Sequence, residues 1–274
     1  MSGETISKGN QDNSTRFSRY VGIDYSGAKA PDDRLSGLQL CAAVQGGEAV
    51  RIHPPESQTK RASRWSRRAL FDWLSGQLKH GPPMIVGIDH GFSFPRSYFK
   101  RYGLRSWNAF LNDFVAHWPT DQEGITVESV RRRQRGRSLR TGEPSELRLT
   151  EKWTTSAKSV FQFDVQGQVA KSTHAGLPWL RRLRATCRPH VHFWPFDGWE
   201  IPENKSVIAE IFPSLFRKRY ARDGRTVDQQ DAYSVSRWLA EMDAREELSR
   251  FLCPPLSRTE KNIALLEGWV LGVC

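Results

Sequence analysis

Cysteine is scarce in this chain of 274 residues, and its four cysteines are widely spaced. They are Cys41, Cys187, Cys253 and Cys274. They show no metal-ligand spacing, and the seven histidines likewise form no zinc pattern. We therefore expect free thiols in a reducing compartment and no disulfide framework.

Long apolar runs are missing as well. No stretch reaches the roughly 18 apolar residues of a membrane span, and residues 1–18 lack the apolar centre of a signal peptide. That first segment is rich in Ser, Asn and Gly, which predicts a disordered polar tail. Residues 19–274 are then expected to form one domain. These absences favour a cytoplasmic protein without membrane contact, and nothing in the sequence implies a protein partner.

Acidic residues are outnumbered by basic ones. The chain has 41 Lys and Arg against 30 Asp and Glu, a formal net charge of +11. Residues 91–205 hold 19 of the basic and 11 of the acidic residues, so this segment carries +8 of that charge. A basic balance of this kind favours polyanionic partners, nucleic acid above all.

An arginine-rich stretch inside that segment is a candidate for phosphate contacts. Its candidate residues are Arg131, Arg132, Arg133 and Arg135. The alternative is a solvated loop, because Glu143 and Glu146 follow closely and charge runs are often disordered.

The tetrapeptide Val-Gly-Ile-Asp occurs twice, ending at Asp24 and at Asp89, and a third apolar run over residues 206–210 ends in Glu210. Short β-branched runs bounded by turn residues predict buried strands. The expected strands cover residues 19–24, 37–44, 48–53, 84–89 and 206–210. Apolar residues at helical spacing predict helices over residues 64–79, 107–118, 228–242 and 263–270.

Acidic residues end three of these strands, and in open α/β sheets ligands gather at the carboxyl ends of the strands. Asp24 and Asp89 would lie about 4.8 Å apart on neighbouring parallel strands. Glu210 would come from the next strand and Asp231 from the helix beside it, whose buried stripe Asp228 extends. Such oxygen ligands suit Mg²⁺ or Mn²⁺, and two ions about 4 Å apart assist phosphoryl displacement.

We therefore predict Asp24, Asp89, Glu210 and Asp231 as catalytic and metal-binding residues, with Asp228 as a further metal ligand. The helical ligand is taken as Asp231, although Asp228 remains the alternative. The simpler interpretation is that each strand-end acid caps a helix or accepts loop amides.

Two further residues, Lys171 and His174, are candidates for substrate binding. Either could hold a phosphate near the metals, and a histidine with a shifted pKa could act as general acid. The alternative for a lone histidine is a structural position.

The order of these features resembles the ribonuclease-H-like superfamily. Within it, the chain is most similar to an uncharacterised bacterial and archaeal family of predicted nucleases. The matching segments are residues 22–28, 87–89, 93–95, 172–176, 209–214, 228–232 and 267–269. Asp231 directly precedes Ala232, as in that family's motif.

This resemblance implies an α/β fold with a mixed five-stranded sheet flanked by helices. The first three strands would be antiparallel, the others parallel to strand one, and residues 91–205 a basic, partly helical insertion between strands four and five. It also implies phosphodiester cleavage of DNA or RNA with two Mg²⁺ or Mn²⁺ ions.

Two alternative functions remain open. Asp24-Tyr25-Ser26-Gly27 also resembles the first phosphate loop of actin-like and sugar-kinase folds, and ATP binding would support that phosphotransferase. The other alternative is a non-catalytic module that holds nucleic acid through its basic segment. Nucleic-acid affinity without metal or cleavage would favour it.

Overall fold

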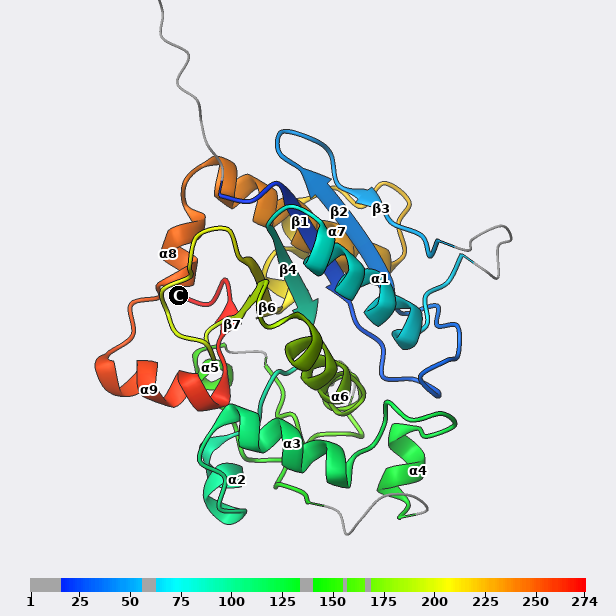
Figure 1. Ribbon diagram of the computed structural model, residues 1–274, viewed down its shortest axis with the longest axis vertical. Helices are drawn as coiled ribbons and strands as arrows, with labels where there is room; N and C mark the ends of the chain where they lie inside the picture. Colours follow the sequence, from blue (N-terminus) through cyan, green and yellow to red (C-terminus); the bar gives the residue numbers. More distant parts are fainter. Residues whose placement is uncertain (1–15, 56–62, 134–139, 155–156, 166–168) are drawn as a thin grey trace, which may run out of the picture.

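A mixed β-sheet runs through the centre of the protein in the structure, a computed structural model that describes residues 16–55, 63–133, 140–154, 157–165 and 169–274 (Figure 1). Within these residues the sheet has seven strands in the order β3-β2-β1-β4-β6-β5, and β7 also pairs with β6. The strands are β1 (Arg19–Asp24), β2 (Gln39–Val44), β3 (Val50–Arg51), β4 (Met84–Asp89), β5 (Val191–Phe193), β6 (Ser206–Ile211) and β7 (Val270–Leu271).

Strand direction divides the sheet into two parts. β2 is antiparallel to both β1 and β3, whereas β4 is parallel to β1 and β6 is parallel to β4, β5 and β7. The predicted α/β class, a mixed sheet with helices, is confirmed.

The predicted number of five strands is wrong, because two short strands extend the sheet beside β6. β5 pairs with the first half of β6 and β7 with its second half. Residues 263–270 were expected to be helical throughout, but α9 ends at Glu267 because Gly268 has a φ of 77°. The chain then turns and enters β7 at Val270.

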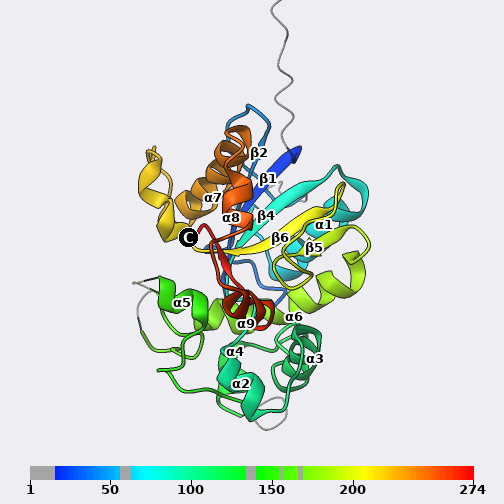
Figure 2. The ribbon, with the colours of Figure 1, turned by 90° about the vertical axis from the view of Figure 1, so that its left-hand side faces the viewer.

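Helices cover both faces of the sheet (Figure 2). Helix α7 packs on β1 and β2, whereas α1 and α6 lie on the opposite face. Between β4 and β6 the chain forms α2 to α6 and β5. The helices of the described residues are α1 (Arg67–His80), α2 (Arg96–Arg101), α3 (Trp107–His117), α4 (Val127–Arg131), α5 (Leu149–Trp153), α6 (Ala170–Cys187), η1 (Pro213–Leu215), η2 (Arg217–Arg219), α7 (Val227–Ala244), α8 (Leu248–Leu252) and α9 (Arg258–Glu267).

The repeated Val-Gly-Ile-Asp places alternate side chains on opposite faces of the sheet. Val21 and Ile23 belong to the core that α1 and α6 cover. Gly22 faces α7, where an added Cβ would lie 2.2 Å from the carbonyl oxygen of Ala232. Glycine therefore permits the close approach of α7, and the residue two positions later, Asp24, faces the same side.

The N-terminal segment is ordered earlier than the sequence predicts. Phe17 is 2% exposed, and its amide donates a hydrogen bond to Asp243 at 3.1 Å. The predicted tail thus stops short of residue 17, and its residues 1–15 lie outside the described ranges. All four cysteines are described and free. None of the helices in the described ranges combines the length and apolar character of a membrane span.

Candidate carboxylate site

The two acids that end β1 and β4 contact one another. Asp24 and Asp89 are register partners on adjacent parallel strands, and the Asp24 carboxyl donates a hydrogen bond to Asp89. Asp24 is 9% exposed. Among the described residues, no Lys, Arg or His side chain is hydrogen-bonded to either carboxyl group. The predicted pairing of these two acids at the sheet edge is therefore present.

Burial and crowding shift both acids strongly. Burial, and then the charge of Asp89, raise the pKa of Asp24 to about 9. Burial, followed by the charges of Asp231 and Glu210, raises the pKa of Asp89 to about 8. At neutral pH the pair therefore retains protons that an exposed carboxyl would release.

Helix α7 brings two more acids to the same place. Thr226 caps the helix by accepting a hydrogen bond from the amide of Gln229, so Asp228 and Asp231 lie in its first two turns. Burial and then the charge of Asp231 raise the pKa of Asp228.

Asp231 is 5% exposed and already has a basic partner. Arg217, from η2, donates hydrogen bonds to both of its carboxylate oxygens. The guanidinium of Arg217 also lowers the pKa of Asp24 and of Asp89 by its charge.

Glu210 lies on the other face of the sheet. Its register partner is Ile88, not Asp89, and side chains of successive strand residues point to opposite faces. Arg148 donates to its two oxygens at 2.7 and 2.5 Å, and the amide of Phe92 donates at 2.9 Å. Arg148 also donates to Glu151 at 2.8 Å, which completes a buried network.

The structure thus brings Asp24, Asp89, Asp231 and Asp228 together and separates Glu210 from them by one step of register. In the part of the chain that the structure describes, no three His, Cys, Asp or Glu side chains are already arranged around one metal position. The carboxylate oxygens of Asp24 and Asp89 suit Mg²⁺ or Mn²⁺ chemically, and Asp231 would join them only if Arg217 moved.

A cavity of about 480 Å³ opens beside this cluster. Lys171, a predicted substrate-binding residue, lines it together with Asp24 and Asp228, and forms an ion pair with Glu128 at 2.8 Å. The full lining is Asp24, Tyr25, Ser26, Gly27, Ala28, Lys29, Gly37, Thr126, Val127, Glu128, Lys171, Ser172 and Asp228.

The other predicted substrate-binding residues lie elsewhere. His174 is 1% exposed, its Nδ1 is 2.8 Å from the carbonyl oxygen of Ala170, and burial lowers its pKa to about 3. Rings of Phe94, Phe114, Trp118 and Phe163 surround it. Because burial lowers its pKa, His174 is neutral at physiological pH. None of the site carboxylates affects its pKa, so the structure places His174 in the core and not at the site.

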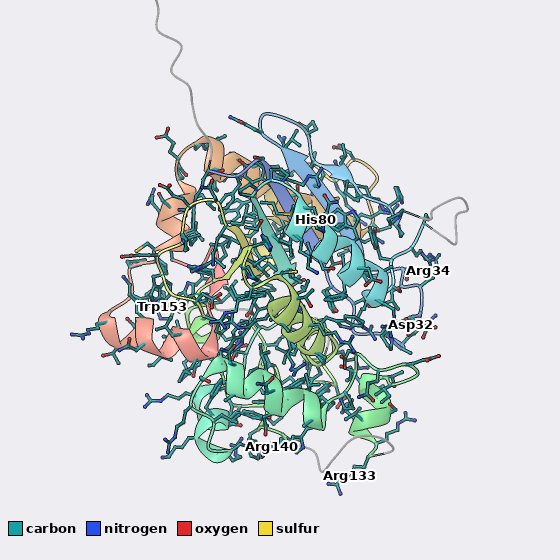
Figure 3. The ribbon with its side chains drawn as sticks, in the orientation of Figure 1. Asp32, Arg34, His80, Arg133, Arg140 and Trp153 are labelled. Atoms are coloured by element: carbon teal, nitrogen blue, oxygen red, sulfur yellow. The ribbon has the colours of Figure 1, made fainter. Side chains whose placement is uncertain are left out.

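The arginine stretch is only partly described. Arg131 donates hydrogen bonds to Asp164 and Glu128. Arg132 and Arg133 are exposed, and Arg133 lies at the lower edge of the view in Figure 3. Arg135 lies outside the described residues.

Sequence reasoning missed three arginines that organise this region. Arg217 had a signal, since Arg217-Lys218-Arg219 follows closely on the strand that ends in the site. Arg67 and Arg148 had none, because no sequence pattern distinguishes either residue from other basic residues of the chain and only the fold buries it.

Comparison with known proteins gave no relatives. No family model, no curated protein and no solved structure matches the chain.

Proposed function

We propose that this protein is a divalent-metal-dependent nuclease that hydrolyses phosphodiester bonds in DNA or RNA. The observation that carries the proposal is the contact between the buried Asp24 and the half-buried Asp89, two carboxyls joined by a hydrogen bond and without a bonded basic partner among the described side chains. Two such acids in contact need either a proton or a cation between them.

A divalent cation would replace the proton in this pair. Metal ligands must be deprotonated, so binding would release protons and become tighter as the pH rises through the raised pKa values. Asp24 and Asp89 would hold the metal, and Asp228 and Asp231 would supply further oxygens. Bound Mg²⁺ or Mn²⁺ would stabilise the charge on the attacking and leaving oxygens of a phosphodiester.

The surrounding residues hold the carboxylates in position. Thr226 fixes the start of α7 and thereby Asp228 and Asp231. Arg148 holds Glu210 behind Asp89, and Glu210 accepts a hydrogen bond from the amide of Phe92, at the point where the chain leaves β4. In this proposal Glu210 orients its neighbours, and it binds no metal unless Arg148 releases it.

The topology supports the proposal. Neighbouring strands of β1, β2 and β3 are antiparallel, whereas β4 is parallel to β1 and β6 to β4, which agrees with the strand directions that the ribonuclease-H-like resemblance implies. In a nuclease of this fold, the segment between β4 and β6 would be the basic insertion. The net charge of +11 favours a polyanionic substrate.

Cleavage assays test the proposal. We expect the purified protein to cut single- or double-stranded DNA or RNA with Mn²⁺, and Asp24→Asn and Asp89→Asn to abolish cutting while circular dichroism stays unchanged. Asp72→Asn is the matched control, because Asp72 is an exposed acid of α1. Cutting that survives in Asp24→Asn, or wild-type protein without metal-dependent cutting of any form, would refute it.

A non-catalytic nucleic-acid-binding role is the second candidate. It is favoured by the ion pairs of Arg217 with Asp231 and of Arg148 with Glu210, which neutralise two of the predicted ligands. Nucleic-acid affinity that is unchanged by chelator, in a protein that takes up no Mn²⁺ in calorimetry, would favour this role over the nuclease.

A further inference from the structure

The loop that leaves β1 is held by a buried arginine of α1. Arg67 is 1% exposed, and its guanidinium donates hydrogen bonds to the carbonyl oxygens of Ser26, Ala28 and Lys29 at 3.1, 2.7 and 2.9 Å. Three carbonyls of one short loop thus point toward the same cation. In Figure 1 the blue segment after β1 runs between α1 and α6.

Because Arg67 binds the carbonyl groups of this loop, the backbone amides of the loop remain available to donate hydrogen bonds to a ligand. The amides of Ser26, Gly27 and Lys29 donate to no acceptor within the described ranges. All three residues line the cavity of about 480 Å³. Lys29 is exposed and has a φ of 54°, a left-handed conformation that turns the chain at the end of the loop.

The opposite wall of the same cavity is fixed against this loop. A Cβ on Gly27 would lie 2.1 Å from the carbonyl oxygen of Lys171, so only glycine lets the loop reach α6. The Lys171 ammonium lines the cavity as well, and its ion pair with Glu128 neutralises that acid. The donors are therefore preorganised before any ligand arrives.

We propose that this loop is a phosphate-binding site, in which the amides of Ser26 and Gly27 and the ammonium of Lys29 hold a phosphate group. Successive backbone amides that converge on a concavity bind anions. Because Asp24 lines the same cavity, the bound phosphate belongs next to the phosphodiester that is cut; this placement rests on the proposed nuclease function. The phosphate comes either from a nucleic-acid backbone or from a free nucleotide.

Binding in the absence of metal tests the site apart from cleavage. The probe is a fluorescein-labelled 12-nucleotide oligothymidylate, followed by anisotropy in EDTA over a series of salt concentrations, with ATP and pyrophosphate as competitors. If unlabelled oligonucleotide displaces the labelled probe and millimolar ATP does not, the phosphate belongs to a nucleic-acid backbone. Displacement by micromolar ATP assigns it to a nucleotide.

Two variants address the loop directly. Lys29→Ala should weaken binding about 3- to 10-fold and reduce the slope of log K against log salt by about 0.7, the value for one lost contact to a single strand. Arg67→Lys keeps a positive charge but loses the three-carbonyl geometry, and should weaken pyrophosphate binding similarly.

Lys100→Ala is the control, because Lys100 is an exposed lysine of α2 outside the cavity lining. If Lys29→Ala binds the oligonucleotide and pyrophosphate as tightly as Lys100→Ala does, the phosphate site is refuted, even if Arg67→Lys proves unstable. If the wild type binds the oligonucleotide in a way that depends on Lys29 but cuts no nucleic acid, only the nuclease function is refuted.

Discussion

Asp24→Asn should change how the stability of the protein depends on pH and on metal. Burial and then the charge of Asp89 raise the pKa of Asp24 to about 9. Burial and then the charges of Asp231 and Glu210 raise the pKa of Asp89 to about 8, whereas both acids titrate near 4 in the unfolded chain. Between these limits the folded state holds protons that the unfolded state has released. The metal-free protein must therefore lose stability as the pH rises through this window, and recover it as the pH falls.

The size of the effect follows from the protons held. Each extra proton in the folded state lowers the free energy of unfolding by about 1.4 kcal/mol per pH unit. One proton on the pair thus amounts to roughly 3 kcal/mol between pH 6 and pH 8, or a melting temperature lower by about 5–10 °C for a chain of this size. The new side-chain amide of the Asp24→Asn variant can still donate a hydrogen bond to Asp89, but it does not titrate and so causes no such loss of stability with rising pH.

Thermal unfolding in EDTA and in Mn²⁺ measures the difference. In EDTA we expect Asp24→Asn to match the wild type at pH 5 and to exceed it in melting temperature at pH 8. Mn²⁺ at about 100 times its dissociation constant should add about 2.7 kcal/mol to the wild type and little to the variant, and so remove most of the difference between them at pH 8.

Two results would refute this reasoning. If the difference between wild type and Asp24→Asn in EDTA is the same at every pH, the two carboxyls do not share a proton in the folded protein. If Mn²⁺ stabilises both proteins equally, the ion binds elsewhere. Asp72→Asn, which alters an exposed acid, should follow the wild type throughout.

Three further substitutions separate the parts of the site. Arg217→Gln should lower the melting temperature in EDTA but tighten Mn²⁺ binding in calorimetry, because it frees Asp231 from its competing cation; weaker Mn²⁺ binding would contradict this. Arg148→Met should destabilise the protein by about 3–5 kcal/mol in denaturant titration, because it leaves Glu210 buried without its partner. His174→Phe should leave the cleavage rate unchanged, whereas a large loss at an unchanged melting temperature would return His174 to its predicted role as an acid.

The sequence predicted the centre of the fold well. The ranges 19–24 and 84–89 match β1 and β4, because strands buried on both faces are continuous apolar runs and Pro83 marks a boundary. Helix α7 was predicted within two residues at each end, from its apolar stripe. The short strands β5 and β7 were missed, since two or three residues carry no periodic pattern.

The candidate site was harder to predict, because its geometry depends on register and on partners. A strand-end acid is visible in the sequence, but whether it shares a face with Asp89 depends on which residue pairs with it. Glu210 pairs with Ile88, and this single step directs it to the opposite face. Its partner Arg148 is 62 residues away in the chain and no local pattern indicates the contact.

The two arginines of the site differ in how firmly each is held, and in the proposed nuclease this difference would decide which acids bind a metal. Arg148 is 2% exposed and is bonded to both Glu210 and Glu151. It cannot move away without leaving two buried carboxylates unpaired. The side chain of Arg217 is 41% exposed and bonds one acid, so it can swing into solvent when a competing cation arrives. In the proposed nuclease, Asp231 is therefore the acid that a metal would recruit to Asp24 and Asp89, while Glu210 would stay with Arg148.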